Sequence, residues 1–416
     1  MAKKCRSEYP LSSNDCQKTL KIGRILAQFS IVVPSESPMH GARNLVYMKT
    51  KKIVFTLHML GQAGTERVAC ILASGFAKAG YDTTMIIFSD NGGAAKAMSE
   101  LLDKRVNKIV LGQGSGSRSK DLIRFLPKCS ACLKQIRPDF VMSTGNHMNL
   151  ITAIATQRSG IETKLILKAT NPIIHKQHRG IKGAARKLGY HLAFHRADMV
   201  LTLSDAERKQ LLLSFPRIED KVRKAINPYV TPAMLQASNY VPSSVETKIV
   251  LGVGRFQKQK RFDRLIRAFA LVKDSAAKLV ILGDGTERPA CVELIEELGI
   301  AHRVFLPGFV TDVASWYKRA SVFVLSSDYE GLPAVILEAL AGNCPVLSTD
   351  CFPAVHDILE PLDHCKIIAP PSPENIAEHI DTILGKQTVG NLAHAANEYS
   401  IESGIASHIK SVASFG

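Results

Sequence analysis

The chain has 416 residues, of which 46% are hydrophobic and 22% are charged. This length exceeds a single core of usual size, so we expect two domains. No run of about 18 uninterrupted apolar residues occurs, which argues against a membrane-spanning helix. The apolar stretch 25–34 is too short for a secretory signal, so we expect a cytoplasmic protein. The nine cysteines are scattered and odd in number, a pattern typical of neither a disulfide framework nor a metal site.

Charge is distributed unevenly along the chain. Residues 1–240 contain 37 Lys and Arg against 16 Asp and Glu, whereas residues 241–416 contain 16 against 21. The N-terminal part therefore carries a balance of +21 and the C-terminal part a balance of −5. A strongly basic half indicates an anionic partner, which could be nucleic acid, acidic lipid headgroups or a phosphorylated substrate. A merely solvated basic surface is the alternative, and charge alone does not separate these possibilities.

The first 47 residues show little periodicity, and we interpret residues 1–47 as a flexible extension. Between residues 48 and 230, buried strands alternate with amphipathic helices, which predicts a parallel sheet covered by helices. We predict strands at 53–57, 83–88, 108–111, 140–143, 164–168 and 199–203. Gly64 lies in a glycine turn after the first strand, and His147 follows the fourth strand. Because the carboxyl ends of parallel strands share one edge, both would face the same cleft.

The alternating pattern lapses over residues 231–246, which we interpret as a linker. A second series follows over residues 247–390, with a helical tail at 391–416. Its predicted strands are 248–253, 278–282, 304–307, 322–325 and 345–348. The fold class predicted is therefore α/β, with two Rossmann-like, doubly wound domains facing an interdomain cleft.

A basic turn follows the first strand of the second series. Arg255 comes directly after Gly254, and Lys260 follows five residues later. An Arg and a Lys in one strand-to-helix turn can both reach a diphosphate and neutralise its charge. The alternative is a solvated basic turn. After the next strand, Gly283 and Gly285 flank an aspartate, as in a tight turn between strand and helix.

Residues 320–351 form the most informative stretch. An apolar strand ends in a polar turn carrying Glu330 and Gly331, and a helix then starts at Pro333, a residue that suits a first helical turn. Glu330 is thereby placed at the carboxyl end of a parallel strand beside a helix N-terminus, where α/β sheets bind ligands and anions. Glu338 lies further along this helix. A capping acid and a surface acid are the alternative interpretation of the two glutamates.

The segment Glu330-Gly-Leu-Pro with Glu338-Ala-Leu-Ala-Gly resembles the E-x7-E signature of retaining glycosyltransferases of family 4, which have the GT-B fold. Gly254-Arg255 and Lys260 match the family's Gly-Arg-x4-Lys-Gly, although Arg261 stands where Gly is common. The resemblance implies that Glu330 binds the transferred sugar, Glu338 the ribose, and Arg255 with Lys260 the diphosphate, and that His147 is functional. It also implies donor-site roles for Gly64, Gly254, Gly283, Gly285, Gly331 and Leu332.

The resemblance further implies a transfer reaction. A hexosyl or N-acetylhexosaminyl group would move from a nucleotide sugar, with UDP favoured, to a glycan or polyprenyl- or lipid-linked acceptor. The setting would be bacterial cell-surface polysaccharide or lipopolysaccharide biosynthesis. We expect no cofactor and no metal, since no Asp-x-Asp motif follows a strand and cationic side chains replace the ion. In the family the C-terminal tail crosses back to the first domain.

The basic first domain fits an anionic membrane, so we expect peripheral association with the inner face of the cell membrane. Two other functions stay open. A GT-B-shaped sugar-nucleotide epimerase would share the architecture. A nucleic-acid-binding protein would explain the charge, but not the turn with Glu330 and Glu338, and aromatic residues make up only 6% of the chain.

Overall fold

A computed structural model describes residues 50–61, 64–90, 98–171, 180–235, 248–385 and 391–415. The extension expected at 1–47 and most of the linker expected at 231–246 lie outside the described residues. The chain from Thr50 to Gly416 forms one compact unit. No helix in the described ranges is both long and apolar enough to cross a membrane.

The first sheet has seven parallel strands in the order β3-β2-β1-β4-β5-β6-β7. Their bounds are β1 (Lys52–Met59), β2 (Asp82–Ser89), β3 (Asn107–Val110), β4 (Phe140–Ser143), β5 (Lys164–Lys168), β6 (Met199–Thr202) and β7 (Val222–Lys224). Six of these are the predicted strands, with ends shifted by a few residues at most. The sequence pattern did not predict β7, a three-residue edge strand with two exposed residues. The strand order reverses between β1 and β4, which is where open α/β sheets bind ligands.

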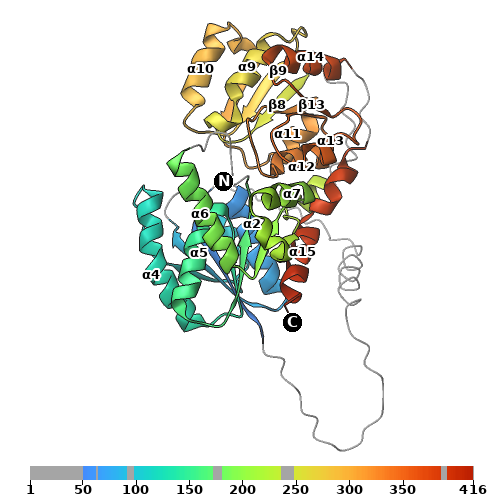
Figure 1. The fold of residues 1–416 in the computed structure, drawn as a ribbon. Helices are drawn as coiled ribbons and strands as arrows, with labels where there is room; N and C mark the ends of the chain where they lie inside the picture. The colour runs from blue at the N-terminus through green and yellow to red at the C-terminus, as the bar shows by residue number, and fades with distance from the viewer. Residues whose placement is uncertain are drawn as a thin grey trace, which may run out of the picture. The chain divides into compact units, whose positions relative to one another are not determined.

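Helices cover both faces of this sheet (Figure 1). Phe55 of β1 packs in a core cluster with α2 (Gly64–Lys78) and the C-terminal α15 (Ile401–Ala413). Its neighbour Val54 points the other way, into a cluster that includes α4 (Arg118–Ile136), α5 (Asn146–Ser159) and α6 (Ile181–Arg196). The alternation follows from the two-residue period of a strand. Both faces of β1 are therefore buried, as expected for a central parallel strand.

The second sheet has six parallel strands in the order β10-β9-β8-β11-β12-β13. Their bounds are β8 (Ile249–Val253), β9 (Lys278–Leu282), β10 (Val304–Gly308), β11 (Val322–Leu325), β12 (Val346–Thr349) and β13 (Lys366–Ile368). One face packs against α9 (Phe262–Ala270), α10 (Arg288–Glu297) and α14 (Pro373–Leu384). The other packs against α11 (Ala314–Arg319), α12 (Ala334–Ala341) and α13 (Val355–Leu359). The strand order reverses between β8 and β11, so each sheet is doubly wound, as predicted.

Further elements lie in the connections and near the C-terminus. They are α7 (Asp205–Ser214), η2 (Pro216–Lys221), α8 (Pro232–Leu235), η4 (Lys258–Lys260), η5 (Ala301–Arg303) and η6 (Ala393–Tyr399). One prediction needs correction, because α12 begins at Ala334 and Pro333 is its N-cap, with an extended ψ of 114°. Residue 333 thus precedes the first helical turn instead of opening it.

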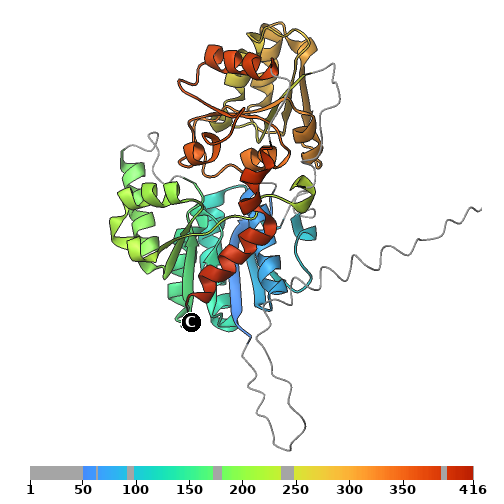
Figure 2. The same ribbon diagram turned by 90° about the vertical axis from the view of Figure 1, so that its right-hand side faces the viewer.

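The C-terminal segment runs back to the first sheet (Figure 2). Ser400 forms a parallel bridge with Val230, and α15 then packs on α2. The packing is close at two glycines. A Cβ on Gly75 of α2 would lie 2.7 Å from the Ile405 side chain, and one on Gly404 would lie 2.4 Å from the Pro228 nitrogen.

Candidate functional site

One cavity of about 450 Å³ gathers the turns that follow β1, β4 and β5 of the first sheet and β8, β9 and β11 of the second. Since all the strands are parallel, their carboxyl ends carry these turns. The polar residues in its lining are Thr65, Thr144, Lys168, Thr170, Asn171, Asn227, Tyr229, Arg255, Gln257, Gln259, Lys260, Asp284 and Glu330. The cavity therefore lies at the switch points of both sheets, where the topology predicts a ligand.

Glu330 and Lys260 form an ion pair at this cavity. The Lys260 Nζ lies 2.7 Å from the Glu330 Oε1, and the Ser327 hydroxyl donates to the same oxygen at 2.8 Å. The backbone N–H of Glu330 donates to the Cys351 carbonyl at 2.7 Å. These contacts fix the carboxylate, and its Oε2 has no hydrogen-bond partner among the described residues. The family resemblance implies that Glu330 binds the sugar and Lys260 the diphosphate, whereas the structure brings the two side chains into contact.

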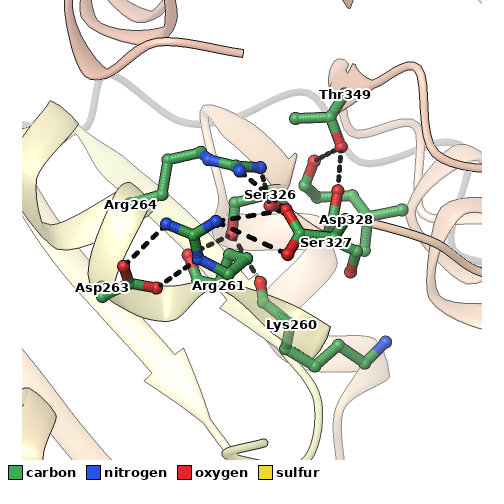
Figure 3. Close-up of polar contacts among 9 residues, drawn as sticks. Lys260, Arg261, Asp263, Arg264, Ser326, Ser327, Asp328 and Thr349 are labelled. Atoms are coloured by element: carbon green, nitrogen blue, oxygen red, sulfur yellow. Dashed lines mark hydrogen bonds and ion pairs between the residues drawn. The ribbon is translucent and has the colours of Figure 1, made fainter. Parts of the chain in front are cut away.

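The turn behind Lys260 is held by a network of charges (Figure 3). Arg261 has a φ of +51°, in the left-handed region that favours glycine, which explains why glycine is common at this position in the family. Its guanidinium pairs with Asp263 at 3.0 Å and with Asp328 at 3.2 Å. Arg264 also reaches Asp328, at 2.7 Å, and donates to the Ser326 carbonyl. The Lys260 side chain extends away from this network.

Arg255 also lines the cavity, and its side chain is exposed. It has no ion-pair partner in the part of the chain that the structure describes. Close packing fixes the backbone around it: a Cβ on Gly283 would lie 2.0 Å from the Gly254 carbonyl oxygen, and one on Gly285 would lie 2.4 Å from the Phe256 carbonyl oxygen. These two glycines thus let the turns after β8 and β9 touch, and Gly254 and Gly283 also line the cavity.

The turn of Gly331 and Leu332 contacts the first sheet's loops. A Cβ on Gly331 would lie 2.1 Å from the Thr170 carbonyl oxygen, so only glycine fits there. The Leu332 carbonyl accepts a hydrogen bond from the Tyr229 hydroxyl at 3.1 Å. Leu332 lines the cavity, as does Gly64, the first residue of α2.

Glu338 lies outside the cavity lining as the described residues define it. The Arg67 Nη1 of α2 donates to its Oε1 at 2.8 Å, and the buried Tyr317 hydroxyl donates to its Oε2 at 3.4 Å. The carboxylate is buried, whereas the Arg67 side chain is one third exposed. The sequence pattern did not predict Arg67 as the partner of Glu338.

His147 is likewise absent from that lining, although its neighbour Thr144 belongs to it. Its ring lies 6.0 Å from that of His58. Burial, helped by the nearby Arg118 and His58, lowers the pKa of His147 to about 4. His147 is therefore a neutral imidazole beside the site, and not a cation within it.

The cavity is also lined by a buried lysine that the sequence motifs did not indicate. Lys168 ends β5, and its Nζ lies 2.7 Å from the Asn227 Oδ1 and 2.6 Å from the His408 Nε2. Asn227 in turn donates to the Tyr229 hydroxyl at 2.9 Å. The one sequence signal is a lysine that ends an apolar strand, Lys-Leu-Ile-Leu-Lys.

Two doubly wound domains whose strand ends meet at one cavity, with a cationic turn beside an ion-paired glutamate, define a GT-B glycosyltransferase. Family models agree. Residues 63–222 match the "Glycosyl transferase 4-like domain" and residues 238–403 match "Glycosyl transferases group 1". The chain carries both glycosyltransferase domains and belongs with these enzymes.

Curated relatives support this membership, and a solved structure shares the fold. An uncharacterized glycosyltransferase of Haemophilus influenzae is 28% identical over 80% of this chain and 90% of its own. A Campylobacter jejuni enzyme, N-acetylgalactosamine-N,N'-diacetylbacillosaminyl-diphospho-undecaprenol 4-alpha-N-acetylgalactosaminyltransferase, is 26% identical over 72% of this chain and 81% of its own. The structure of HepE from Anabaena with UDP and glucose superimposes with a TM-score of 0.71 over 88% of this chain and 100% of HepE, at 16% identity. This last likeness concerns the fold.

Proposed function

We propose that this glycosyltransferase moves a hexosyl or N-acetylhexosaminyl group from a UDP-sugar to a glycan or lipid-linked acceptor, with retention of the anomeric configuration. The reaction would belong to cell-surface polysaccharide biosynthesis. One observation carries the proposal: the cationic turn with Arg255 and Lys260 and the turn with Glu330 line a single cavity at the carboxyl ends of both sheets.

The residues suggest how such a donor would be held. The Arg255 guanidinium, without an ion-pair partner in the described part of the chain, can neutralise the charge that develops on a departing diphosphate. The first N–H groups of α12 can bind the same phosphates, since the helix N-terminus lies at the cavity. Glu330, with Oε1 fixed by Lys260, offers Oε2 to sugar hydroxyls. Glu338 would bind the ribose, in which case the ribose must displace Arg67.

Similar proteins support the proposed classes of donor and acceptor. HepE was solved with UDP, which supports a uridine nucleotide. The name of the Campylobacter jejuni relative describes an acceptor linked through diphosphate to undecaprenol, which supports a lipid-linked acceptor.

Nucleotide-dependent thermal stabilisation tests the donor site. We expect UDP to raise the melting temperature of the full chain in proportion to the logarithm of its concentration, and ADP and GDP to do so less. Arg255→Ala should weaken UDP binding about tenfold or more without affecting uridine, because one charge-assisted contact is lost. Glu338→Gln should weaken both ligands, because uridine retains the ribose. The control is Glu297→Gln, at the exposed end of α10.

Other outcomes would contradict the proposal. If no nucleotide raised the melting temperature, the proposed donor site would be wrong. Turnover of a free UDP-sugar without acceptor would favour an epimerase, and tight binding of random DNA without nucleotide binding would favour a nucleic-acid-binding protein. A product of inverted anomeric configuration, seen by NMR, would exclude retention.

A further inference from the structure

Lys168 is a buried amine without a carboxylate partner. Lys168 is only 1% exposed. The groups that face its Nζ are the Asn227 amide, in the loop after β7, and the His408 ring of α15. No Asp or Glu among the described residues forms an ion pair with it.

Both neighbours of the amine act as acceptors. The His408 Nδ1 lies 2.8 Å from the Gly404 carbonyl oxygen, which can only accept, so Nδ1 carries the proton and Nε2 is left to accept from Lys168. Burial, together with the Lys168 charge, lowers the pKa of His408 well below its ordinary value. The Asn227 Nδ2 donates to Tyr229, which leaves its Oδ1 to accept. Two N–H groups of Lys168 are therefore committed, and one position of the nitrogen remains.

A purely structural role explains this arrangement poorly. Burial without a counter-charge makes the ammonium form of this lysine costly, and an amide would make the same two hydrogen bonds without that cost. Lys168 also lines the cavity that holds Arg255 and Lys260. An anionic group bound in this cavity would supply the missing counter-charge.

We propose that Lys168 binds a phosphate oxygen of the substrate, with Asn227 and His408 as positioning residues. The inference rests on the proposed function and extends the phosphate site from the second sheet to the first. The phosphate belongs either to the donor's diphosphate or to the diphosphate of a lipid-linked acceptor. These two sources share one chemistry, and binding measurements distinguish them.

Proton uptake on binding provides a readout that a structural role would not give. Burial lowers the pKa of Lys168 to about 7, so the amine is mostly neutral at pH 8 in the empty cavity. A bound phosphate favours the charged form, so binding should draw in a proton. A nucleoside diphosphate is already fully ionised at pH 8, because its last phosphate pKa is about 6. The proton taken up on binding is therefore bound by the protein and not by the ligand.

The experiment is calorimetry of the full chain at pH 8 in two buffers that differ in ionisation enthalpy. UDP represents the donor and farnesyl diphosphate the lipid-linked acceptor. We expect wild type to take up roughly one half to one proton with one of these ligands. Lys168→Gln, which keeps an N–H donor, and Lys168→Met should abolish this uptake and weaken that ligand about tenfold. Lys164→Met, at the exposed start of β5, should resemble wild type.

The ligand that shows the effect identifies the source of the phosphate. If both ligands bind and the Lys168 variants match wild type in affinity and proton count, the inference is wrong while the proposed function stands. If wild type binds neither ligand, the proposed function fails and the inference with it. Circular dichroism and melting temperatures of the variants separate lost binding from lost folding. His408→Gln should reduce the proton uptake only in part, since it acts through Lys168.

Discussion

At the scale of single residues, the ion pair of Arg67 and Glu338 joins side chains 271 positions apart in the sequence. The carboxylate is buried, with Arg67 and Tyr317 as its hydrogen-bond donors. We expect Arg67→Ala to lower the free energy of unfolding by about 1–3 kcal/mol, because a buried charge loses its counter-charge. The double variant Arg67→Ala with Glu338→Gln also removes the carboxylate charge. Its loss in free energy of unfolding should be smaller than the sum of the losses in the two single variants.

Urea unfolding of the two single variants and the double variant measures this coupling. Arg105→Ala serves as the control, since Arg105 pairs with Asp103 at the exposed surface and should cost at most about 1 kcal/mol. Strictly additive effects of Arg67→Ala and Glu338→Gln would show that the pair contributes nothing in solution.

At the scale of elements, α7 begins with a reciprocal cap. The Ser204 hydroxyl accepts from the Glu207 backbone N–H at 3.1 Å, and the Glu207 carboxylate accepts from the Leu203 N–H at 2.8 Å. We expect Ser204→Ala to cost about 1 kcal/mol in chemical denaturation, because a helix N–H loses its acceptor. Ser214→Ala, at the other end of α7, is the control and should be neutral or slightly stabilising. Equal stabilities of the two variants would contradict a capping role.

At the scale of the whole molecule, the helices α4 and α6 combine apolar and basic side chains on one face of the first sheet. Ile123, Leu188 and Leu192 are 71%, 58% and 41% exposed. Exposed cations on the same helices include Arg124, Lys128, Arg186 and Lys187. Such a surface is typical of peripheral binding to anionic membranes. We propose that it contacts the inner face of the cell membrane.

Vesicle sedimentation tests this proposal. Binding to vesicles with anionic lipid should exceed binding to neutral vesicles and should weaken as salt is raised. The double change Leu188→Glu and Leu192→Glu should reduce it, because insertion becomes costly and the charges repel. The control is Leu213→Glu. Leu213 lies on α7 and is 87% exposed, so this change should leave vesicle binding unchanged. Equal binding to neutral and anionic vesicles at any salt would show the proposal to be wrong.

The sequence by itself determined the alternation of strands and helices, because each buried parallel strand and each amphipathic helix leaves a local pattern in the chain. It also indicated the turns of Arg255 and Lys260 and of Glu330, since a strand end followed by a helix start locates such turns at one edge of a sheet. The edge strand β7, with three residues, left too short a pattern to be predicted.

Only the tertiary structure decided which polar groups meet. Lys168 and His408 are 240 positions apart, and their contact depends on α15 returning to the first sheet. The pairing of Arg67 with Glu338 and of Lys260 with Glu330 likewise follows from packing. Periodicity reports which face of an element is buried, but the partner of a buried polar group is set by whatever element covers it.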